Sequence, residues 1–137
     1  MRTLIILAFL LGMNVLHAQS ILGKWNTFDD RTGENRSTVE FYEKGGRIYG
    51  KIIGLASAED AQKTCTLCTD DRKNKPIIGL EIVRGMAKKS NLWQGGTILD
   101  PEDGKAYTCK IWLEEGNLKV RGYVGVFYRT QTWKRVE

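Results

Sequence analysis

The chain has 137 residues, with 21 Lys and Arg against 16 Asp and Glu, and one histidine, His17. This length is typical of a single domain. The small positive excess is spread over short runs such as 72–75 (RKNK) that contain no aromatic residues. We therefore expect no nucleic-acid binding, which needs a concentrated basic surface.

The first 18 residues have the three parts of a secretory signal peptide. Arg2 supplies a positive charge, an apolar run (TLIILAFLLGMNVL) follows, and Ala18 is a small residue suited to cleavage. We expect residues 1–18 to be removed and residues 19–137 to be secreted or periplasmic as one domain. The apolar run is shorter than the roughly 20 residues of a spanning helix, so the processed protein is not expected to span a membrane. An uncleaved anchor is the alternative.

Processing would also remove His17, and with it the only imidazole of the chain. Ser-His-Asp and Cys-His hydrolases need a histidine base, and many zinc sites need histidine ligands. These mechanisms are excluded from the processed domain. No catalytic residue, metal or cofactor is predicted.

After the signal, short runs that alternate apolar and polar residues are separated by glycine-bearing turns, which is typical of antiparallel strands. Strands are expected near residues 21–28, 36–43, 47–54, 80–84, 92–99, 105–114, 117–124 and 130–136. Eight strands are enough to close a barrel, so the predicted fold class is all-β, a single antiparallel β-barrel. In run 105–114 the face with Tyr107, Cys109, Ile111 and Leu113 is expected to point inward, because the opposite face carries the charges.

Residues 55–79 interrupt the alternating pattern and predict one long loop. Its segment 56–63 (ASAEDAQK) has a helical composition, so a short helix is expected there. A connection of this length in a small β domain is usually functional or disordered. The loop is therefore the first candidate for a functional site.

Cys65 and Cys68 lie in this loop, in the sequence CTLCTDDRKNKP, and Cys109 lies in a predicted strand. A structural zinc needs four ligands and a thioredoxin-like centre needs a βαβ unit; neither pattern is visible. A disulfide is favoured, because disulfides persist in oxidising compartments. Cys65 with Cys68, or Cys109 with either of them, are the pairings left open, and each leaves one free thiol.

Residues 23–25 (GKW) resemble the G-x-W motif that opens lipocalin and related calycin barrels. The resemblance implies a calycin-like barrel in which Trp25 closes the base and a basic residue from a late strand packs across its ring. Arg135 is the expected partner, in a cation–π pair worth about 0.5 to 2 kcal/mol.

A longer resemblance covers nearly the whole processed chain. The run 95–133 (GGTILDPEDGKAYTCKIWLEEGNLKVRGYVGVFYRTQTW), with GKW and the run 71–83 (DRKNKPIIGLEIV), is similar to small exported bacterial proteins grouped as domain of unknown function number 2147. The resemblance implies a β-rich fold and a secreted or envelope location in Gram-negative bacteria. It brings no established activity and so no catalytic residues.

Three functions remain open from the sequence. The first is a non-catalytic module that binds a small apolar or amphipathic ligand in the barrel mouth; an apolar pocket of roughly 300 Å³ or more would favour it. Its candidate ligand-binding residues are Trp25, Tyr107, Trp112, Tyr123, Trp133, Asp70 and Arg72. The second is a structural protein of the envelope that binds a partner protein through strand edges or the long loop. The third is an enzyme that uses a thiol or the loop carboxylates Asp70, Asp71, Asp100 and Glu102.

Overall fold

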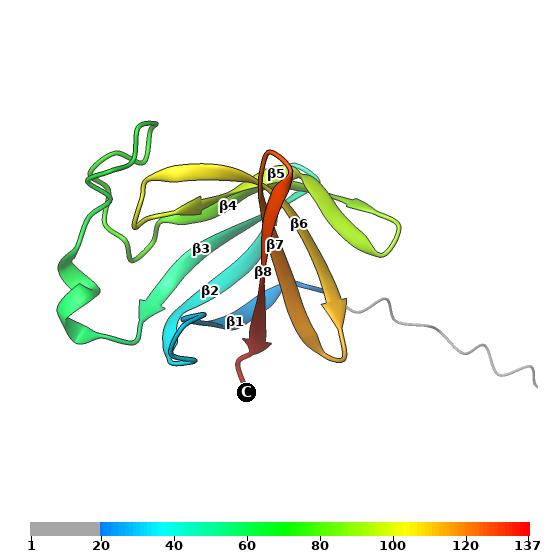
Figure 1. The fold of residues 1–137 in the computed structure, drawn as a ribbon, viewed down its shortest axis with the longest axis horizontal. Helices are drawn as coiled ribbons and strands as arrows, with labels where there is room; N and C mark the ends of the chain where they lie inside the picture. The colour runs from blue at the N-terminus through cyan, green and yellow to red at the C-terminus, as the bar shows by residue number, and fades with distance from the viewer. Residues whose placement is uncertain (1–19) are drawn as a thin grey trace, which may run out of the picture.

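The computed structural model describes residues 20–137, so the predicted signal segment and its cleavage after Ala18 lie outside the described part. Residues 20–137 form a closed antiparallel barrel in which each strand pairs with its neighbours in the chain (Figure 1). The strands are β1 (Gly23–Phe28), β2 (Asn35–Lys44), β3 (Arg47–Leu55), β4 (Glu81–Lys89), β5 (Leu92–Asp100), β6 (Lys105–Glu114), β7 (Asn117–Val124) and β8 (Phe127–Arg135). The predicted all-β fold class and its eight strands are confirmed.

Two strands extend three or more residues beyond the predicted ranges. β4 continues to Lys89, because Gly85 adopts a φ of 70° and lets the strand pass through an irregular stretch of its pairing with β3. β8 begins at Phe127, which pairs directly with Val124 of β7. The turn between β7 and β8 is therefore tighter than the sequence predicts, and the two strands form a long hairpin.

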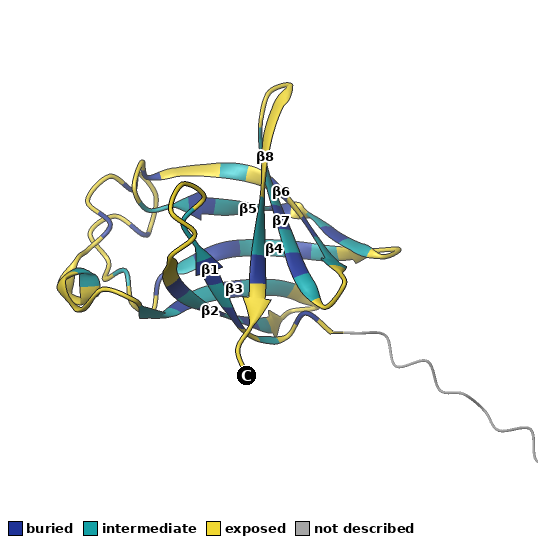
Figure 2. Ribbon diagram, turned by 60° about the horizontal axis from the view of Figure 1, so that its bottom comes forward, coloured by how far each residue is buried: buried dark blue, intermediate teal, exposed yellow. Residues whose placement is uncertain are grey.

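The core fills the barrel interior. Every second residue of the strands points inward, and these positions form the dark bands along the strands in Figure 2. The largest buried side chains on the strands include Trp25, Val39, Phe41, Val83, Met86, Ile111, Leu118 and Trp133. Phe41 and Trp133 approach with ring centroids 6.0 Å apart. Cys109 and Ile111 are buried as predicted.

The base of the barrel is closed by Trp25, whose side chain is fully buried. Its indole Nε1 donates a hydrogen bond to the carbonyl of Ile21 at 2.9 Å. The guanidinium of Arg135 lies 4.2 Å from the ring centroid and donates to the carbonyls of Leu22 and Ser20 at 3.1 and 2.8 Å. The predicted packing of Arg135 across Trp25 is confirmed.

The barrel closes where β1 meets β8, and this seam is short. Only Trp25 with Arg135 and Asn26 with Lys134 are paired, followed by one bond from the amide of Val136 to the carbonyl of Lys24 at 3.0 Å. The rest of β8 pairs with β7 alone in the described chain, and the end of the β7–β8 hairpin projects from the barrel (Figure 2).

The long loop, residues 56–80, joins β3 to β4 at the barrel end where β1 finishes, and it lies on the left in Figure 1. The predicted short helix is present as a 3₁₀ helix, η1 (Ala58–Gln62). After it the chain folds back on itself, with bonds of 2.8 Å from the amide of Cys65 to the carbonyl of Lys75 and from the amide of Asn74 to the carbonyl of Cys65. The loop is thus an ordered element with its own hydrogen bonds.

Candidate functional site

A disulfide joins Cys65 to Cys68 inside the loop, with their Cα atoms 5.4 Å apart. The expected disulfide is therefore present, and of the pairings that the sequence leaves open the local one is observed. Cys109 is a free, buried thiol on β6, and burial raises its pKa to about 12. A thiol held protonated in this way is a poor nucleophile.

Arg72 holds the loop against the barrel. Its side chain is only 3% exposed. The guanidinium donates to both carboxylate oxygens of Asp70, with the shortest bond at 2.6 Å, and to the backbone carbonyl of Glu81 on β4 at 2.9 Å. These bonds lower the pKa of Asp70. Asp70 and Arg72, two of the predicted ligand-binding residues, therefore form an ion pair that anchors the loop.

A second set of ion pairs lies beside the Asp70–Arg72 pair. Arg84 of β4 donates to both oxygens of Asp71 at 2.8 and 2.9 Å and to Glu81 at 2.7 Å. The hydrogen bonds from Arg84 lower the pKa of Asp71 to about 2. Glu81 also accepts a hydrogen bond from the hydroxyl of Tyr42.

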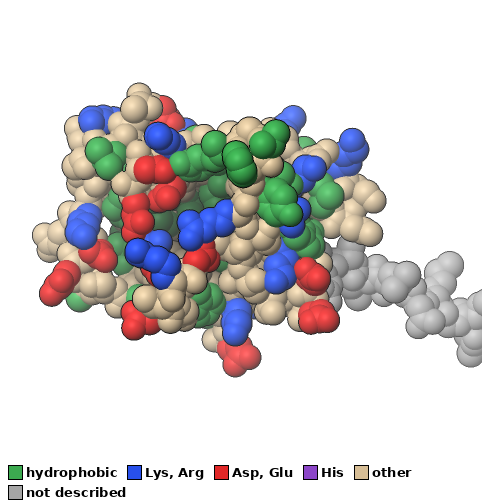
Figure 3. Space-filling model, viewed as in Figure 1, with side chains coloured by type: hydrophobic (Ala, Val, Ile, Leu, Met, Phe, Trp, Pro, Cys, Tyr) green, Lys and Arg blue, Asp and Glu red, His purple; other side chains and the backbone are tan. Residues whose placement is uncertain are grey.

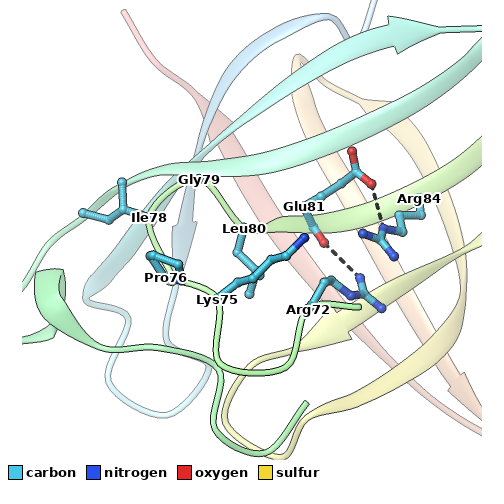
Figure 4. A pocket seen from close by; sticks show the side chains of 8 residues that line it. All are labelled: Arg72, Lys75, Pro76, Ile78, Gly79, Leu80, Glu81 and Arg84. Carbon is cyan, nitrogen blue, oxygen red and sulfur yellow. Dashed lines mark hydrogen bonds and ion pairs between the residues drawn. The ribbon is translucent and has the colours of Figure 1, made fainter. Parts of the chain in front are cut away.

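This cluster borders a pocket of about 270 Å³ (Figure 4). The pocket is lined by Arg72, Lys75, Pro76, Ile78, Gly79, Leu80, Glu81 and Arg84. The one carboxylate of its lining, Glu81, accepts hydrogen bonds from Tyr42 and Arg84, which lower its pKa, whereas a general acid needs a carboxyl whose pKa is raised toward the working pH. Glu81 is therefore held as an ion-pair partner of Arg84.

The other loop carboxylates also have structural partners. Glu102 pairs with Arg36. Asp100 accepts the amide of Glu102 at 2.9 Å in the β5–β6 turn, and burial raises its pKa. Within residues 20–137, no group of three or more His, Cys, Asp or Glu side chains is placed to hold a metal ion.

A larger concave site lies at the rim of the barrel, between the disulfide loop, the β5–β6 turn and the end of β7. We call it the rim groove. Its volume is about 560 Å³, and it is lined by Leu67, Thr69, Asp70, Asp103, Gly104, Lys105, Ala106, Tyr107, Thr108, Tyr123 and Val124. The groove thus combines residues from three segments that are far apart in the chain.

Gly104 lets the loop approach the rim. It adopts a φ of 73°, and a Cβ atom at this position would collide with the backbone of Leu67 and Cys68. Glycine alone avoids both the collision and the strain of this conformation. The wall that Leu67 adds to the rim groove therefore depends on Gly104.

Hydrogen bonds within the rim groove fix the orientation of Tyr107 and Asp103. The hydroxyl of Tyr107 donates to Asp103, and this hydrogen bond raises the pKa of Tyr107 to about 12. Asp103 also accepts the amide of Lys105 at 2.8 Å. Within the described residues, no carboxylate lies within salt-bridge distance of the Lys105 ammonium. The groove therefore offers aromatic and aliphatic walls, a neutral phenol and one cation without a carboxylate partner.

The predicted ligand-binding residues fall into separate places. Tyr107, Tyr123 and Asp70 come together in the rim groove, whereas Trp25 and Trp133 are buried in the barrel. Trp112 lines neither the barrel interior nor the rim groove. Trp112 faces outward opposite Lys119 on β7, and Tyr123 shares that outer face, because the inward positions of β6 and β7 are the alternate ones.

Sequence reasoning missed Leu67, Gly104, Lys105 and Val124 as parts of the site. Leu67 carried a usable signal, because it is, apart from the two cysteines, the one apolar residue of the run 63–75. The other three sit in turns or at a strand end, where only the folded barrel shows what they face.

These features define the protein as a small closed barrel of eight antiparallel strands, with a filled base, an ordered loop at the other end and a groove at the rim. The chain matches, over residues 23–135, the family described as "Uncharacterized protein conserved in bacteria (DUF2147)", and it belongs to this family. The predicted membership is confirmed.

One solved structure supports the fold. It is described as protein HP1028 from the human pathogen Helicobacter pylori, which belongs to the lipocalin family. The TM-score is 0.75 at 22% sequence identity, over 86% of this chain and 84% of that chain. No curated protein matches the sequence. No helix of residues 20–137 is long and apolar enough to cross a membrane.

Proposed function

We propose that this protein is a non-catalytic binding module that takes a small amphipathic ligand in the rim groove. The observation that carries the proposal is the meeting of Leu67, Tyr123 and Val124 with Lys105 and the Tyr107 hydroxyl around one concavity of about 560 Å³. Small-molecule sites are typically concavities of about 300 to 1,000 Å³ with apolar walls and a few fixed polar groups.

The charges of the groove favour an anionic head on the ligand. Asp70 and Asp103 are already bound by Arg72 and Tyr107, whereas Lys105 has no carboxylate partner within the described residues. An alkyl or aromatic body would pack against Leu67 and Tyr123 and leave the head near Lys105. The lipocalin-like fold supports the proposal only as a scaffold, since fold does not determine function.

Laurate is a suitable probe, titrated into ¹⁵N-labelled residues 19–137. We expect saturable shifts at residues 104–108 and 123–124. Tyr123→Ala should weaken binding about tenfold, because one aromatic contact is worth roughly 1.5 kcal/mol. The control is Tyr49→Ala on β3, which stacks on Tyr42 away from the groove. An absence of saturable shifts, or equal affinity in both variants, would refute the proposal.

We also propose that the protein acts outside the cytoplasm, in the periplasm or after secretion. The signal-like segment 1–18 supports this, and so does the Cys65–Cys68 disulfide, since disulfides persist in oxidising compartments. N-terminal mass analysis of the exported protein should find Gln19 as the first residue. Retention of Met1 would contradict this proposal and leave the rim groove unaffected.

A further inference from the structure

The end of the β7–β8 hairpin exposes apolar side chains to solvent. Residues 123–128 (YVGVFY), the hairpin tip, include Val126 at 88% and Phe127 at 76% exposure, and Val124 and Tyr128 are also exposed. Figure 3 shows hydrophobic side chains gathered over the end of this hairpin. An exposed cluster of large apolar residues at a projecting point marks an interaction site more often than a chance feature.

Behind the tip, on the outer face of the hairpin, aromatic side chains come first and cationic side chains come next. Tyr123 and Tyr128 are directly opposite each other, with ring centroids 6.0 Å apart. Next, Arg121 lies 4.2 Å from the Tyr128 ring and 4.9 Å from the Trp112 ring. Lys110 pairs with Arg121 across the strands and lies 5.6 Å from the Tyr123 ring.

These outer-face cations lack acidic partners. Residues 117–135 contain Lys119, Arg121, Arg129, Lys134 and Arg135 and no Asp or Glu. Arg129 is paired with Asp30 at 2.7 Å. Within residues 20–137, no carboxylate lies within salt-bridge distance of Lys110, Lys119 or Arg121. The face is therefore complementary to a negatively charged surface.

We propose that the hairpin tip docks this protein on an anionic phospholipid bilayer. The order of side chains along the hairpin matches the layers of a membrane surface: aliphatic and phenyl groups toward the acyl chains, Tyr and Trp at the interface, and cations at the lipid phosphates. At about 3.3 Å per residue, Arg121 lies roughly 10 Å behind Val124. Interfacial anchors bury their apolar face by about 5 to 10 Å, so both contacts form together.

A bilayer fits this surface better than a protein partner does. The tip is narrow and convex, whereas apolar protein contacts of this kind need a matching groove on the other molecule. A soft bilayer needs no such complementary shape. Docking does not depend on ligand binding in the rim groove, although Tyr123 and Val124 belong to both surfaces.

Sedimentation with vesicles tests the proposal. Residues 19–137 are used because the barrel closes within Gly23–Arg135, and because the apolar run in 1–18 would itself bind lipid. The protein should sediment with vesicles of 30 mol% phosphatidylglycerol in phosphatidylcholine at low salt and less at high salt. Val126→Ser with Phe127→Ser should reduce partitioning at least tenfold without affecting folding, because both side chains are exposed.

Two further double variants distinguish binding that depends on the outer-face charges from non-specific adsorption to vesicles. Lys110→Gln with Arg121→Gln should reduce binding to the anionic vesicles at least tenfold, since each cation near such a surface contributes about fivefold. The matched control is Lys88→Gln with Lys89→Gln at the β4–β5 turn, which should bind as the unchanged protein does. In the Phe127→Trp variant, indole emission should shift to the blue when vesicles are added.

The proposal is overturned if the protein stays in the supernatant with anionic vesicles at low salt. Equal partitioning of the tip variant, the outer-face variant and the control would also overturn it. So would concentration-dependent self-association that the tip variant abolishes, because the tip would then be a contact between copies of the chain.

Discussion

Trp25 combines complete burial, a hydrogen bond to Ile21 and a stacked guanidinium from Arg135. We expect Trp25→Ala to lower the free energy of unfolding by about 3 to 5 kcal/mol, because a large buried aromatic side chain leaves a cavity that the barrel cannot close. Urea denaturation measures the loss. Trp112→Ala on the outer face is the control and should lose much less; a loss below about 1 kcal/mol at Trp25 would contradict its role at the base.

Cys109 should be unreactive while the barrel is folded. Its thiol is buried among core residues and burial raises its pKa to about 12, so access and thiolate formation are both restricted. Thiol counting with an aromatic disulfide reagent at pH 8 should find no rapidly reacting group in the native protein and one after denaturation. One fast thiol in the native protein would contradict the burial of Cys109, and two or three would mean that the Cys65–Cys68 bridge is absent.

Asp71 should make stability depend on pH in the acid range. Its pKa is about 2 in the folded protein, against roughly 3.9 in an unfolded chain. Its contribution is therefore fully present above about pH 5 and is lost as the pH falls through 4 toward 2. Asp71→Asn should lower Tm at pH 6 and have little effect near pH 2. Glu43→Gln, at an exposed position on β2, is the control, and an equal Tm difference at both pH values would contradict the pairing with Arg84.

The disulfide loop and the β5–β6 turn act together through Gly104. Gly104→Ala should lower stability for two reasons: the left-handed backbone is strained for alanine, and the new Cβ collides with the backbone of Leu67. Gly116→Ala isolates the first effect, because Gly116 has a φ of 80° and a Cβ atom there would meet no other atom within 4 Å. We expect about 1 kcal/mol for Gly116→Ala and about 1 to 3 kcal/mol more for Gly104→Ala.

The measurement for this pair is urea denaturation together with laurate titration. Gly104→Ala should also weaken laurate binding, since it displaces the wall that Leu67 forms, whereas Gly116→Ala should leave binding unchanged. Equal losses of stability in the two variants would show that the loop does not press on Gly104.

The strands could be read from the sequence because their alternating pattern is local. The inward set of β6 follows from the same period of two, whereas the role of Trp25 was implied by the resemblance of GKW to the lipocalin motif. The continuation of β4 past Gly85 could not be read, because it depends on pairing with neighbouring strands. Trp112 shows a different limit of sequence reasoning. Its aromatic side chain suggested that it lines a ligand site, whereas its position in the alternation of β6 places it on the outer face.

The rim groove lay beyond sequence reasoning for a related reason. Its walls come from residues 67–70, 103–108 and 123–124, and their meeting depends on how far the disulfide loop folds over the barrel end. The bonds of Arg72 to Asp70 and to the carbonyl of Glu81 fix that position. In the sequence, a buried arginine within a polar run cannot be told from a solvated one. The length of the loop indicated a candidate region, whereas the lining of the rim groove depends on contacts that only the folded chain shows.

At the scale of the whole molecule, the rim groove and the hairpin tip share one end of the barrel, away from Trp25. If the tip rests on a bilayer, the groove opens close to the lipid headgroups, which links the two proposals in space. The docking variants Val126→Ser and Phe127→Ser lie outside the groove lining, so each proposal can fail without the other.

The short β1–β8 seam has a consequence for how the barrel forms and how it fails. Its strands lie at the two ends of the domain, so their pairing closes the largest chain loop and should be a late step in folding. We expect the amides of Asn26 and Val136 to exchange hydrogen earlier than those of β6 and β7, which NMR would measure; slower exchange at the seam would contradict this. An open seam would expose two strand edges that can pair with other chains. The few bonds between β1 and β8 therefore limit how much of these two edges is free to pair with another chain.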